Sequence, residues 1–499
     1  MFKNFPGYKI LEKIQKNKSH KRERKFSLNA IKLLFIVAVT AAIALLPTES
    51  FGIEGLTVVH QRIISLFVFA ALMWLTETMP SWVTSMIVVT VMLFTVSTSS
   101  FNFLRPDGDA GLVPFKSIFA CFSNPTIMLF IGGFVLAIGL TKVKLDVALA
   151  RVLLKPFGTR SEVVLLGFIL VTAIFSAFVS NTATAAMMLA FLTPVLRSLP
   201  ADGKGRIALA LAIPVGANLG GMITPIGTPP NMIALDYLSS QGMGISFVDW
   251  TIKMAPFVIV LLLLSWLLLR ILFPFKQKNI KIEIEGDITW NFKTWSVVVA
   301  FAVTIFMWMF GTDMWGIDTN VVAMIPIAIF CATGILTRRD LEEINWSVLW
   351  MVAGGFALGV ALNYADKANG IPALSSLIVE SVPFDNFSPI AVMILAGLIC
   401  FGFSNFISHS AATSLLVPVL GVVASGLGTA LDGVGGPQAM LVGIAIASSV
   451  SMILPISTPP NAIAHSTGFI EQKDMMKVGI IVGILGLVLG YAMLIFIGF

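Results

Sequence analysis

The chain has 499 residues, of which 57% are hydrophobic and 12% are charged, with a formal net charge of +6 and a mean hydropathy of +0.93. Soluble domains carry about 25% charged residues, so this composition argues against a soluble enzyme or binding module and predicts a chain largely covered by lipid. The cysteines at 121, 331 and 400 lie in apolar sequence without paired spacing, which argues against a disulfide framework or a zinc site.

The first segment, residues 1–29, is a basic leader with nine Lys or Arg and two Glu. A tail that binds nucleic acid or lipid headgroups is one interpretation. An ordinary cytoplasmic leader that follows the positive-inside rule accounts for it more simply. We therefore expect no nucleic-acid partner.

Apolar segments long enough to span a bilayer, which needs roughly 20 residues, follow along the chain. The predicted spans lie near 30–47, 62–79, 81–98, 125–141, 206–223, 254–273, 295–311, 319–336, 347–363, 437–454 and 476–498. Two longer stretches, 163–198 and 387–425, are interrupted by small polar residues and are predicted to be helical hairpins that enter the membrane and turn back. The predicted fold is therefore an all-α polytopic membrane protein with about 11 spans and two re-entrant hairpins.

Basic residues cluster after the fourth, sixth and eighth predicted spans, in 142–160, 270–293 and 338–339. These loops are expected on the cytoplasmic side, together with the N-terminus. The uncharged end of the chain is expected on the opposite side of a cell membrane.

An internal repeat is the most informative pattern in the sequence. Gly132-Gly133-Phe134 recurs as Gly354-Gly355-Phe356, and Ser180-Asn181-Thr182-Ala183 recurs as Ser408-His409-Ser410-Ala411. Gly227-Thr228-Pro229-Pro230-Asn231 recurs as Ser457-Thr458-Pro459-Pro460-Asn461. The offsets are 354−132=222, 408−180=228 and 457−227=230, so the chain is predicted to contain two copies of one structural unit, in inverted orientation.

The hairpin tips at 180–183 and 408–411 are predicted to start new helices at the middle of the membrane. Ser, Asn and Thr are preferred N-cap residues, and the unpaired N–H groups and positive dipole end of such a helix bind carboxylate or phosphate without a basic side chain. A polar loop at the membrane surface would explain one tip, but it would not explain a second one at a fixed offset.

The paired prolines at 229–230 and 459–460 predict a second kind of break, because proline removes N–H donors and stops a helix. The freed carbonyl oxygens would face the gap, where a small cation is expected, and Asn231 and Asn461 are expected to cap the next half-helices. The tips carry no Asp, Glu, Lys or Arg, although a pump or a proton relay would place an acidic residue there.

A membrane-embedded enzyme is a second hypothesis, but the chain has only four widely separated histidines and neither His-Glu-x-x-His nor Gly-x-Ser-x-Gly. We therefore predict no enzymatic activity and no cofactor. An anion channel is a third hypothesis, and two discontinuous helices favour alternating access over a channel.

These tips and broken helices resemble the divalent anion/sodium symporter family of dicarboxylate, tricarboxylate and sulfate carriers. Thr76-Glu77 followed by Pro80 is also similar to that family. The resemblance implies a homodimer in which a transport domain moves against a scaffold like an elevator, carrying small di- or tricarboxylates; sulfate or another divalent inorganic anion is the alternative.

The resemblance also implies the following division of the chain. Residues 30–124 are scaffold, 125–253 are the first repeat core with its broken helix at 206–240, 254–346 are scaffold and the start of the second repeat, 347–475 are the second repeat core with its broken helix at 437–466, and 476–499 are the last span.

The site residues that the resemblance implies fall into two groups. The substrate-binding residues are Asn181, Thr182, Thr228, Pro229, His409, Ser410, Thr458 and Pro459. The cation-binding residues are Ser176, Ser180, Asn181 and Gly227 in the first half, and Ser404 and Ser408 in the second.

His409 departs from the family pattern, which has Asn at this position of the second tip. Imidazole nitrogen is a poor ligand for Na⁺, and a protonated His409 would carry the positive charge itself. Our hypothesis is that the chain binds Na⁺ at Ser176, Ser180 and Asn181 but not around Ser404, Ser408 and His409, and that it is a symporter with one sodium site fewer, an anion exchanger or a proton-linked carrier. The alternative is that His409 is a tolerated variant.

Overall fold

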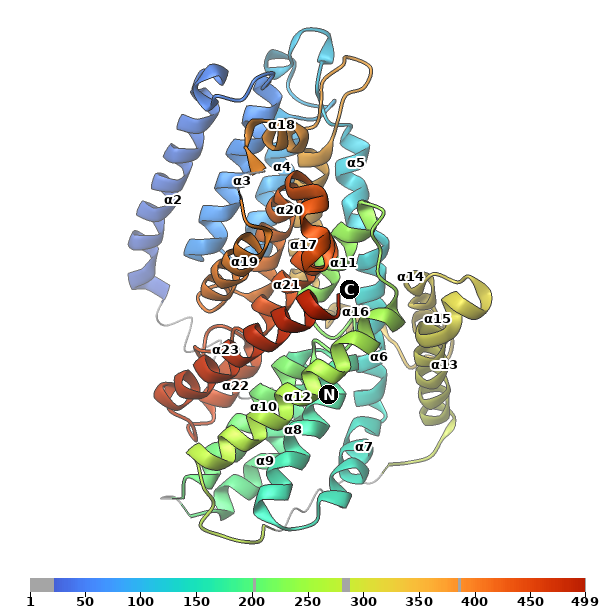
Figure 1. The fold of residues 1–499 in the computed structure, drawn as a ribbon. Coiled ribbons are helices and arrows are strands. Elements are labelled where there is room, and N and C mark those ends of the chain that lie inside the picture. Colours follow the sequence, from blue (N-terminus) through green and yellow to red (C-terminus); the bar gives the residue numbers. More distant parts are fainter. Residues whose placement is uncertain (1–21, 201–202, 281–287, 385–386, 499) are drawn as a thin grey trace.

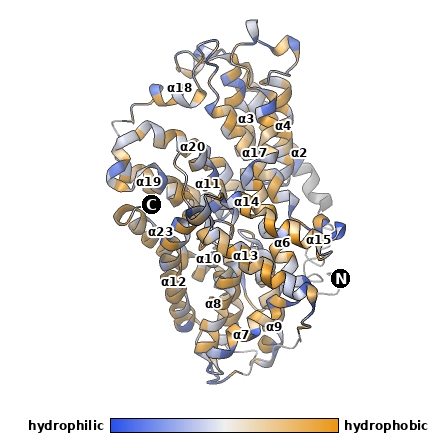
Figure 2. Ribbon diagram, turned by 90° about the vertical axis from the view of Figure 1, so that its right-hand side faces the viewer, coloured by the Kyte–Doolittle hydropathy of each residue, from blue (hydrophilic) through white to orange (hydrophobic). Residues whose placement is uncertain are grey.

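The computed structural model describes residues 22–200, 203–280, 288–384 and 387–498, and these residues form helices but no strand (Figure 1). Most of the basic leader therefore lies outside the described residues. The all-α prediction is confirmed. Hydrophobic residues predominate along the helices and hydrophilic ones gather mainly in the loops at the two ends, as in a bundle surrounded by lipid (Figure 2).

The helices of the first half run from the N-terminal span to the end of the first broken helix and its following span. They are α2 Arg22–Leu45, α3 Val58–Thr76, α4 Ser81–Thr95, α5 Phe115–Ala120, α6 Pro125–Lys142, α7 Leu145–Leu154, α8 Ser161–Phe178, α9 Asn181–Ser198, α10 Gly205–Gly220, α11 Pro229–Ser240 and α12 Phe247–Leu272.

The helices of the second half end with the last span. They are α13 Phe292–Trp315, α14 Thr319–Val322, α15 Met324–Ala332, α16 Arg338–Glu342, α17 Trp346–Asn363, α18 Leu374–Ser381, α19 Pro389–Ser404, α20 His409–Leu427, α21 Gly436–Ser449, α22 Pro459–Ser466 and α23 Gln472–Phe496, with the 3-10 helix η8 Gly428–Val434 between α20 and α21.

Every predicted span falls on a helix or a pair of helices. Eight helical segments of the described residues are long and apolar enough to cross a membrane, and two of them, Ser161–Phe178 and His409–Val434, are arms of the predicted hairpins. The span predicted at 319–336 is divided into α14 and α15, which with α13 stand to one side of the bundle (Figure 1).

Both long interrupted stretches form helix pairs that turn back. In the first, α8 and α9 meet at Val179-Ser180. The start of α8 and the end of α9 both lie near Gln277: Ser161 Oγ donates to the Gln277 carbonyl at 2.6 Å, and Leu199 lines a surface hollow together with Gln277. In the second, a Cβ on Gly426, near the end of α20, would lie 2.4 Å from Phe384, just before α19.

The helix halves that follow each break exchange partners. Helix α11 of the first broken helix packs on α20 and α21, whereas α22 of the second packs on α9 and α10. Each half of the chain therefore completes the core of the other, which brings all four breaks to one place. The inverted relation of the two halves stays a prediction.

Helices α4 and α17 pack side by side and form a wall facing this region. A Cβ on Gly354 would lie 2.4 Å from Ser85 Cβ, so glycine is required for this contact, and Ser85 Oγ donates to the Met351 carbonyl at 3.2 Å.

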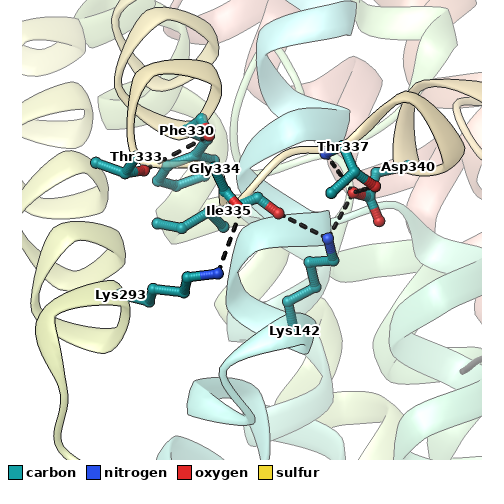
Figure 3. A network of polar contacts seen from close by, with 8 residues as sticks. All are labelled: Lys142, Lys293, Phe330, Thr333, Gly334, Ile335, Thr337 and Asp340. Atoms are coloured by element: carbon teal, nitrogen blue, oxygen red, sulfur yellow. Dashed lines mark hydrogen bonds and ion pairs between the residues drawn. The ribbon is translucent and has the colours of Figure 1, made fainter.

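The loop before α17 is anchored to the end of α6 (Figure 3). Lys142 Nζ donates to the Ile335 carbonyl at 2.6 Å and lies 2.5 Å from Asp340 Oδ2. That carboxylate also accepts from the Thr337 N–H and hydroxyl. Burial alone would raise the pKa of Asp340, but the hydrogen bonds from Lys142 and Thr337 outweigh it, and the net effect is a lowered pKa.

Candidate functional site

A cavity of about 330 Å³ lies where the two helix pairs and the two broken helices meet. Six helices begin at its wall: α9, α11, α20 and α22 at the four breaks, and α4 and α17 on the facing side. First-turn N–H groups have no partner within their helix, and the dipole is positive at that end. Helices α9 and α20 offer both N–H groups and positive potential, whereas α11 and α22 begin with two prolines, which have no N–H, and contribute mainly their dipoles. No Lys or Arg is among the lining residues that the structure describes.

All of the predicted substrate-binding residues line this cavity. The lining includes Ser180, Asn181, Thr182, Gly227, Thr228, Pro229, Ser408, His409, Ser410, Thr458 and Pro459. Asn181 and Ser410, which are 229 positions apart in the sequence (410−181=229), therefore share one space. Ser176 and Ser404 lie behind the lining, fully buried.

Both hairpin tips start helices with a serine cap. Ser180 Oγ accepts from the Ala183 N–H at 3.3 Å, and Ser408 Oγ accepts from the Ala411 N–H at 3.3 Å. These caps leave the N–H groups before Ala183 and Ala411 free to face the cavity.

The prediction that Asn231 and Asn461 cap the next half-helices is wrong. Thr228 and Thr458 hold the N-cap positions, and Thr458 Oγ1 accepts from the Asn461 N–H at 3.2 Å. The Asn231 amide instead donates to the carbonyls of Gly221 and Thr224 at 3.0 and 2.8 Å. The Asn461 amide likewise donates to the carbonyls of Met452 and Leu454 at 2.9 and 3.1 Å, so each asparagine holds its own break together.

Behind the first tip, three oxygen atoms converge. Ser176 Oγ lies 2.6 Å from Asn181 Oδ1 and 2.7 Å from the Ala217 carbonyl oxygen. The Ala217 carbonyl also accepts from the Gly221 N–H at 3.2 Å, so the single hydrogen of the Ser176 hydroxyl is available to Asn181 Oδ1. A Cβ on Gly221 would lie 2.6 Å from Asn181 Oδ1, and the missing side chain is what lets the amide approach.

The second half fills the corresponding space with protein donors. At the offset of 230, Ala447 corresponds to Ala217 (447−217=230) and Ser451 to Gly221 (451−221=230). Ser451 Oγ donates to the Ala447 carbonyl at 2.8 Å, and His409 Nε2 lies 2.6 Å from the Ser451 carbonyl oxygen. The Gly221 carbonyl, which corresponds to that of Ser451, accepts from the Asn231 amide at 3.0 Å, so this carbonyl has a protein partner in both halves.

Asn218 is a functional candidate that the sequence did not reveal. Its amide donates to Asn461 Oδ1 at 3.0 Å and to Thr458 Oγ1 at 3.2 Å, so it joins the first half of the cavity to the second. Its position in the second half is taken by Ser448 (448−218=230), whose hydroxyl donates instead to the His409 carbonyl at 2.9 Å.

The facing wall was also missed, because none of its residues belongs to a duplicated tip. It comprises Ser81, Trp82, Phe130, Gly133, Phe134, Asn345, Ser347, Val348 and Met351. Gly133 and Phe134 belong to the repeated Gly-Gly-Phe motif, which was a signal for their position. Their counterparts Gly355 and Phe356 do not line the cavity, so the two halves contribute unequally.

Comparison with known proteins gives one family over nearly the whole chain. The model described as "sodium:sulfate symporter transmembrane region" matches residues 27–498. An uncharacterized transporter of Haemophilus influenzae is 29% identical over 471 residues, covering 91% of this chain and 94% of that protein. The sodium-dependent dicarboxylate transporter SdcS of Staphylococcus saprophyticus is 27% identical, covering 85% of this chain and 84% of that protein.

Two further similarities are weaker in coverage or identity. The inorganic phosphate transporter PHO87 of Saccharomyces cerevisiae is 27% identical over 91% of this chain but only 47% of its own length. Among solved structures, the YdaH transporter of Alcanivorax borkumensis has a TM-score of 0.53 at 13% identity, covering 87% of this chain and 97% of that one. The latter likeness concerns the fold alone.

Proposed function

We propose that this chain carries small di- or tricarboxylate anions. The chain belongs to the family of the sodium:sulfate symporter transmembrane region and is a secondary transporter. The observation that carries the proposal is the cavity at which four broken-helix N-termini meet without a basic side chain. Two N-termini come from each half, so a substrate with a carboxylate at each end can engage both halves at once. The similarity to a dicarboxylate transporter supports the same substrate class.

Sodium binds in the first half only, in this proposal. Asn181 Oδ1 and the Ala217 carbonyl oxygen lie 2.6 and 2.7 Å from Ser176 Oγ, and such a group of neutral oxygens suits a hard cation that prefers oxygen ligands. In the second half, Ser451 Oγ lies against the Ala447 carbonyl, and the His409 ring, which lies against the Ser451 carbonyl, replaces the amide oxygen that Asn181 supplies in the first half. One coupling sodium, not two, is therefore expected.

Movement of the hairpins and broken helices against α4, α6 and α17 is the proposed route to alternating access. The cavity wall is divided between these two groups of helices, so sliding one against the other carries the tips and a bound anion toward the opposite side. A homodimer, a cytoplasmic N-terminus and an extracytoplasmic C-terminus remain part of this proposal.

Sulfate or another divalent inorganic anion is the alternative substrate. The family name and the similarity to a phosphate transporter favour it, and helix N-termini bind phosphate as readily as carboxylate. The two candidate substrates differ in length. A dicarboxylate can reach the N-termini of both halves, whereas a tetrahedral anion contacts the N-termini of one half.

Counterflow in proteoliposomes tests the function. Labelled succinate should accumulate transiently against its gradient when the vesicles are preloaded with unlabelled succinate or malate, and excess phosphate or sulfate should not compete. Strictly downhill flux would indicate a channel, and competition by phosphate with none by malate would establish the alternative substrate.

The sodium dependence of uptake tests the single cation site. The rate should rise hyperbolically with sodium, with a Hill coefficient close to one, and His409→Asn should make the rise sigmoidal by opening a second site. Ser410→Ala, a neighbouring change that leaves His409 in place, should weaken substrate binding without changing that shape. A sigmoidal wild type, or uptake unaffected by removal of sodium, would contradict the proposal.

A further inference from the structure

A carboxylate lies at the contact between α11 and α6, away from the cavity lining. Thr126 Oγ1 donates to Asp236 Oδ1 at 2.8 Å, and the Asn124 side chain also hydrogen-bonds this carboxyl. Asn124 is itself held in place, because its Oδ1 accepts from the Thr126 N–H at 2.8 Å. The carboxyl of Asp236, a half-buried residue, thus has neutral hydrogen-bond partners at the beginning of α6.

No cation compensates this carboxylate among the described residues. None of the ion pairs found there includes Asp236, and α17 and α21, which pack against α11, carry no titratable group. The other titratable groups on α11 and on the elements around it are Tyr237 on α11, Cys121 just before α6, His409 at the far end of α20, and Lys142 at the far end of α6, which is paired with Asp340.

The depth of Asp236 makes an uncompensated charge costly. It lies seven residues beyond Pro229 at the cavity wall, which is roughly 10 Å along the helix axis. The hydrocarbon core extends about 15 Å on either side of its middle, so a cavity near mid-membrane keeps Asp236 within the apolar layer. Ionisable residues at such depth pair with a cation or bind a proton.

Helix α11 contacts two groups of helices that are proposed to move apart. Tyr237 packs into a notch of α20, where a Cβ on Gly421 would lie 2.3 Å from its ring. Asp236, about 100° around the helix, faces α6. Sliding of α11 together with α20 past α6 would keep the tyrosine contact, break the Thr126 hydrogen bond and expose the carboxyl to water.

We propose that Asp236 is a proton-binding site that couples substrate transport to a proton. Water on one side of the membrane gives up a proton, which forms an O–H bond on the carboxyl. The neutral acid is held against Thr126 and Asn124, and the O–H bond breaks when the separated helices expose it to water on the other side. The inference rests on the proposed transport of carboxylates and adds a second coupling cation to it.

Acid-driven accumulation of succinate tests this coupling. Proteoliposomes would have equal sodium on both sides, the membrane potential clamped at zero, and an external pH one unit below the internal pH. Coupling to one proton supports about tenfold accumulation under these conditions. Wild type and the control Asp432→Asn, which changes an exposed carboxylate after α20, should reach it, whereas Asp236→Asn should only equilibrate.

Succinate counterflow at equal pH separates the two proposals. Asp236→Asn should retain this exchange, because the neutral amide resembles the protonated acid. Loss of exchange in the wild type would refute the transport function itself, whereas acid-driven accumulation by Asp236→Asn, or none by an exchanging wild type, would refute only the coupling. If Asp236→Asn fails to fold, Thr126→Ala serves instead: it should shift the pH of half-maximal uptake, and an unchanged midpoint would overturn the inference.

Discussion

Replacement of Asn218 by alanine tests whether the two halves of the cavity are joined by the hydrogen bonds seen here. The amide donates to Asn461 and Thr458 at 3.0 and 3.2 Å, all three residues are buried, and the change leaves Asn461 Oδ1 without a donor. Interhelical hydrogen bonds within membranes contribute about 0.6 kcal/mol on average and about 1.7 kcal/mol at most. An unpaired buried acceptor costs about 1–3 kcal/mol, so we expect a loss of about 1–2 kcal/mol in the free energy of unfolding.

A double-mutant cycle with Asn461→Ala, followed by titration with sodium dodecyl sulfate in mixed micelles, isolates this interaction. The coupling between positions 218 and 461 should be at least about 0.5 kcal/mol, the lower limit for residues in contact. Asn231→Ala is the matched control, because its amide donates only to Gly221 and Thr224 within its own break. Additive losses for Asn218→Ala and Asn461→Ala would refute the reasoning.

Two further changes probe packing and charge. Gly220→Ala places a Cβ 2.3 Å from Ala173 Cα on α8, and overpacking of this backbone contact should cost about 1–3 kcal/mol, measurable as a lower thermal unfolding temperature in detergent. Asp340→Asn removes the ion pair with Lys142 and should cost about 1.5–3 kcal/mol at neutral pH. The folded-state pKa of Asp340 is lowered from the ordinary value of 3.8 for this carboxyl. The ion pair therefore stabilises the wild type fully above that ordinary pKa, and the stabilisation is lost as the pH falls through the lowered pKa. The two proteins should therefore converge in strong acid, and a difference that persists there would contradict this assignment.

The parts of the site that the sequence predicted depend on local chemistry. Ser180 and Ser408 cap the helices that follow them, as their residue type and position indicate. The paired prolines take the first two positions of α11 and α22, where the N–H that proline lacks has no partner within the helix. The duplication of these motifs predicted that the hairpin tips and the broken helices form one site. No single motif predicts this.

The parts that the sequence did not predict depend on distant partners. Asn218 and Asn461 are 243 positions apart, and Thr126 and Asp236 are 110 positions apart. Residue type alone does not select among so many acceptors, and the choice is made by packing of α22 on α10 and of α11 beside α6. Asn231 does not cap α11 because Thr228 holds the N-cap position and the Asn231 amide donates to the Gly221 and Thr224 carbonyls of its own break.

The proposed sodium and proton together account for the charge of the substrate. A dicarboxylate brings two negative charges, the first-half site brings one sodium, and Asp236 brings one proton, so the loaded cavity and its coupling groups gain no net charge. Moving one elementary charge across the membrane changes the free energy by about 2.3 kcal/mol per 100 mV, and this cost disappears when the charges balance. Net succinate uptake driven by sodium and proton gradients should therefore be unchanged when a potassium diffusion potential of either sign is imposed. If a potential that is negative inside accelerates uptake, more than two cations accompany the substrate. The proposal that His409 removes the second sodium site would then be abandoned first.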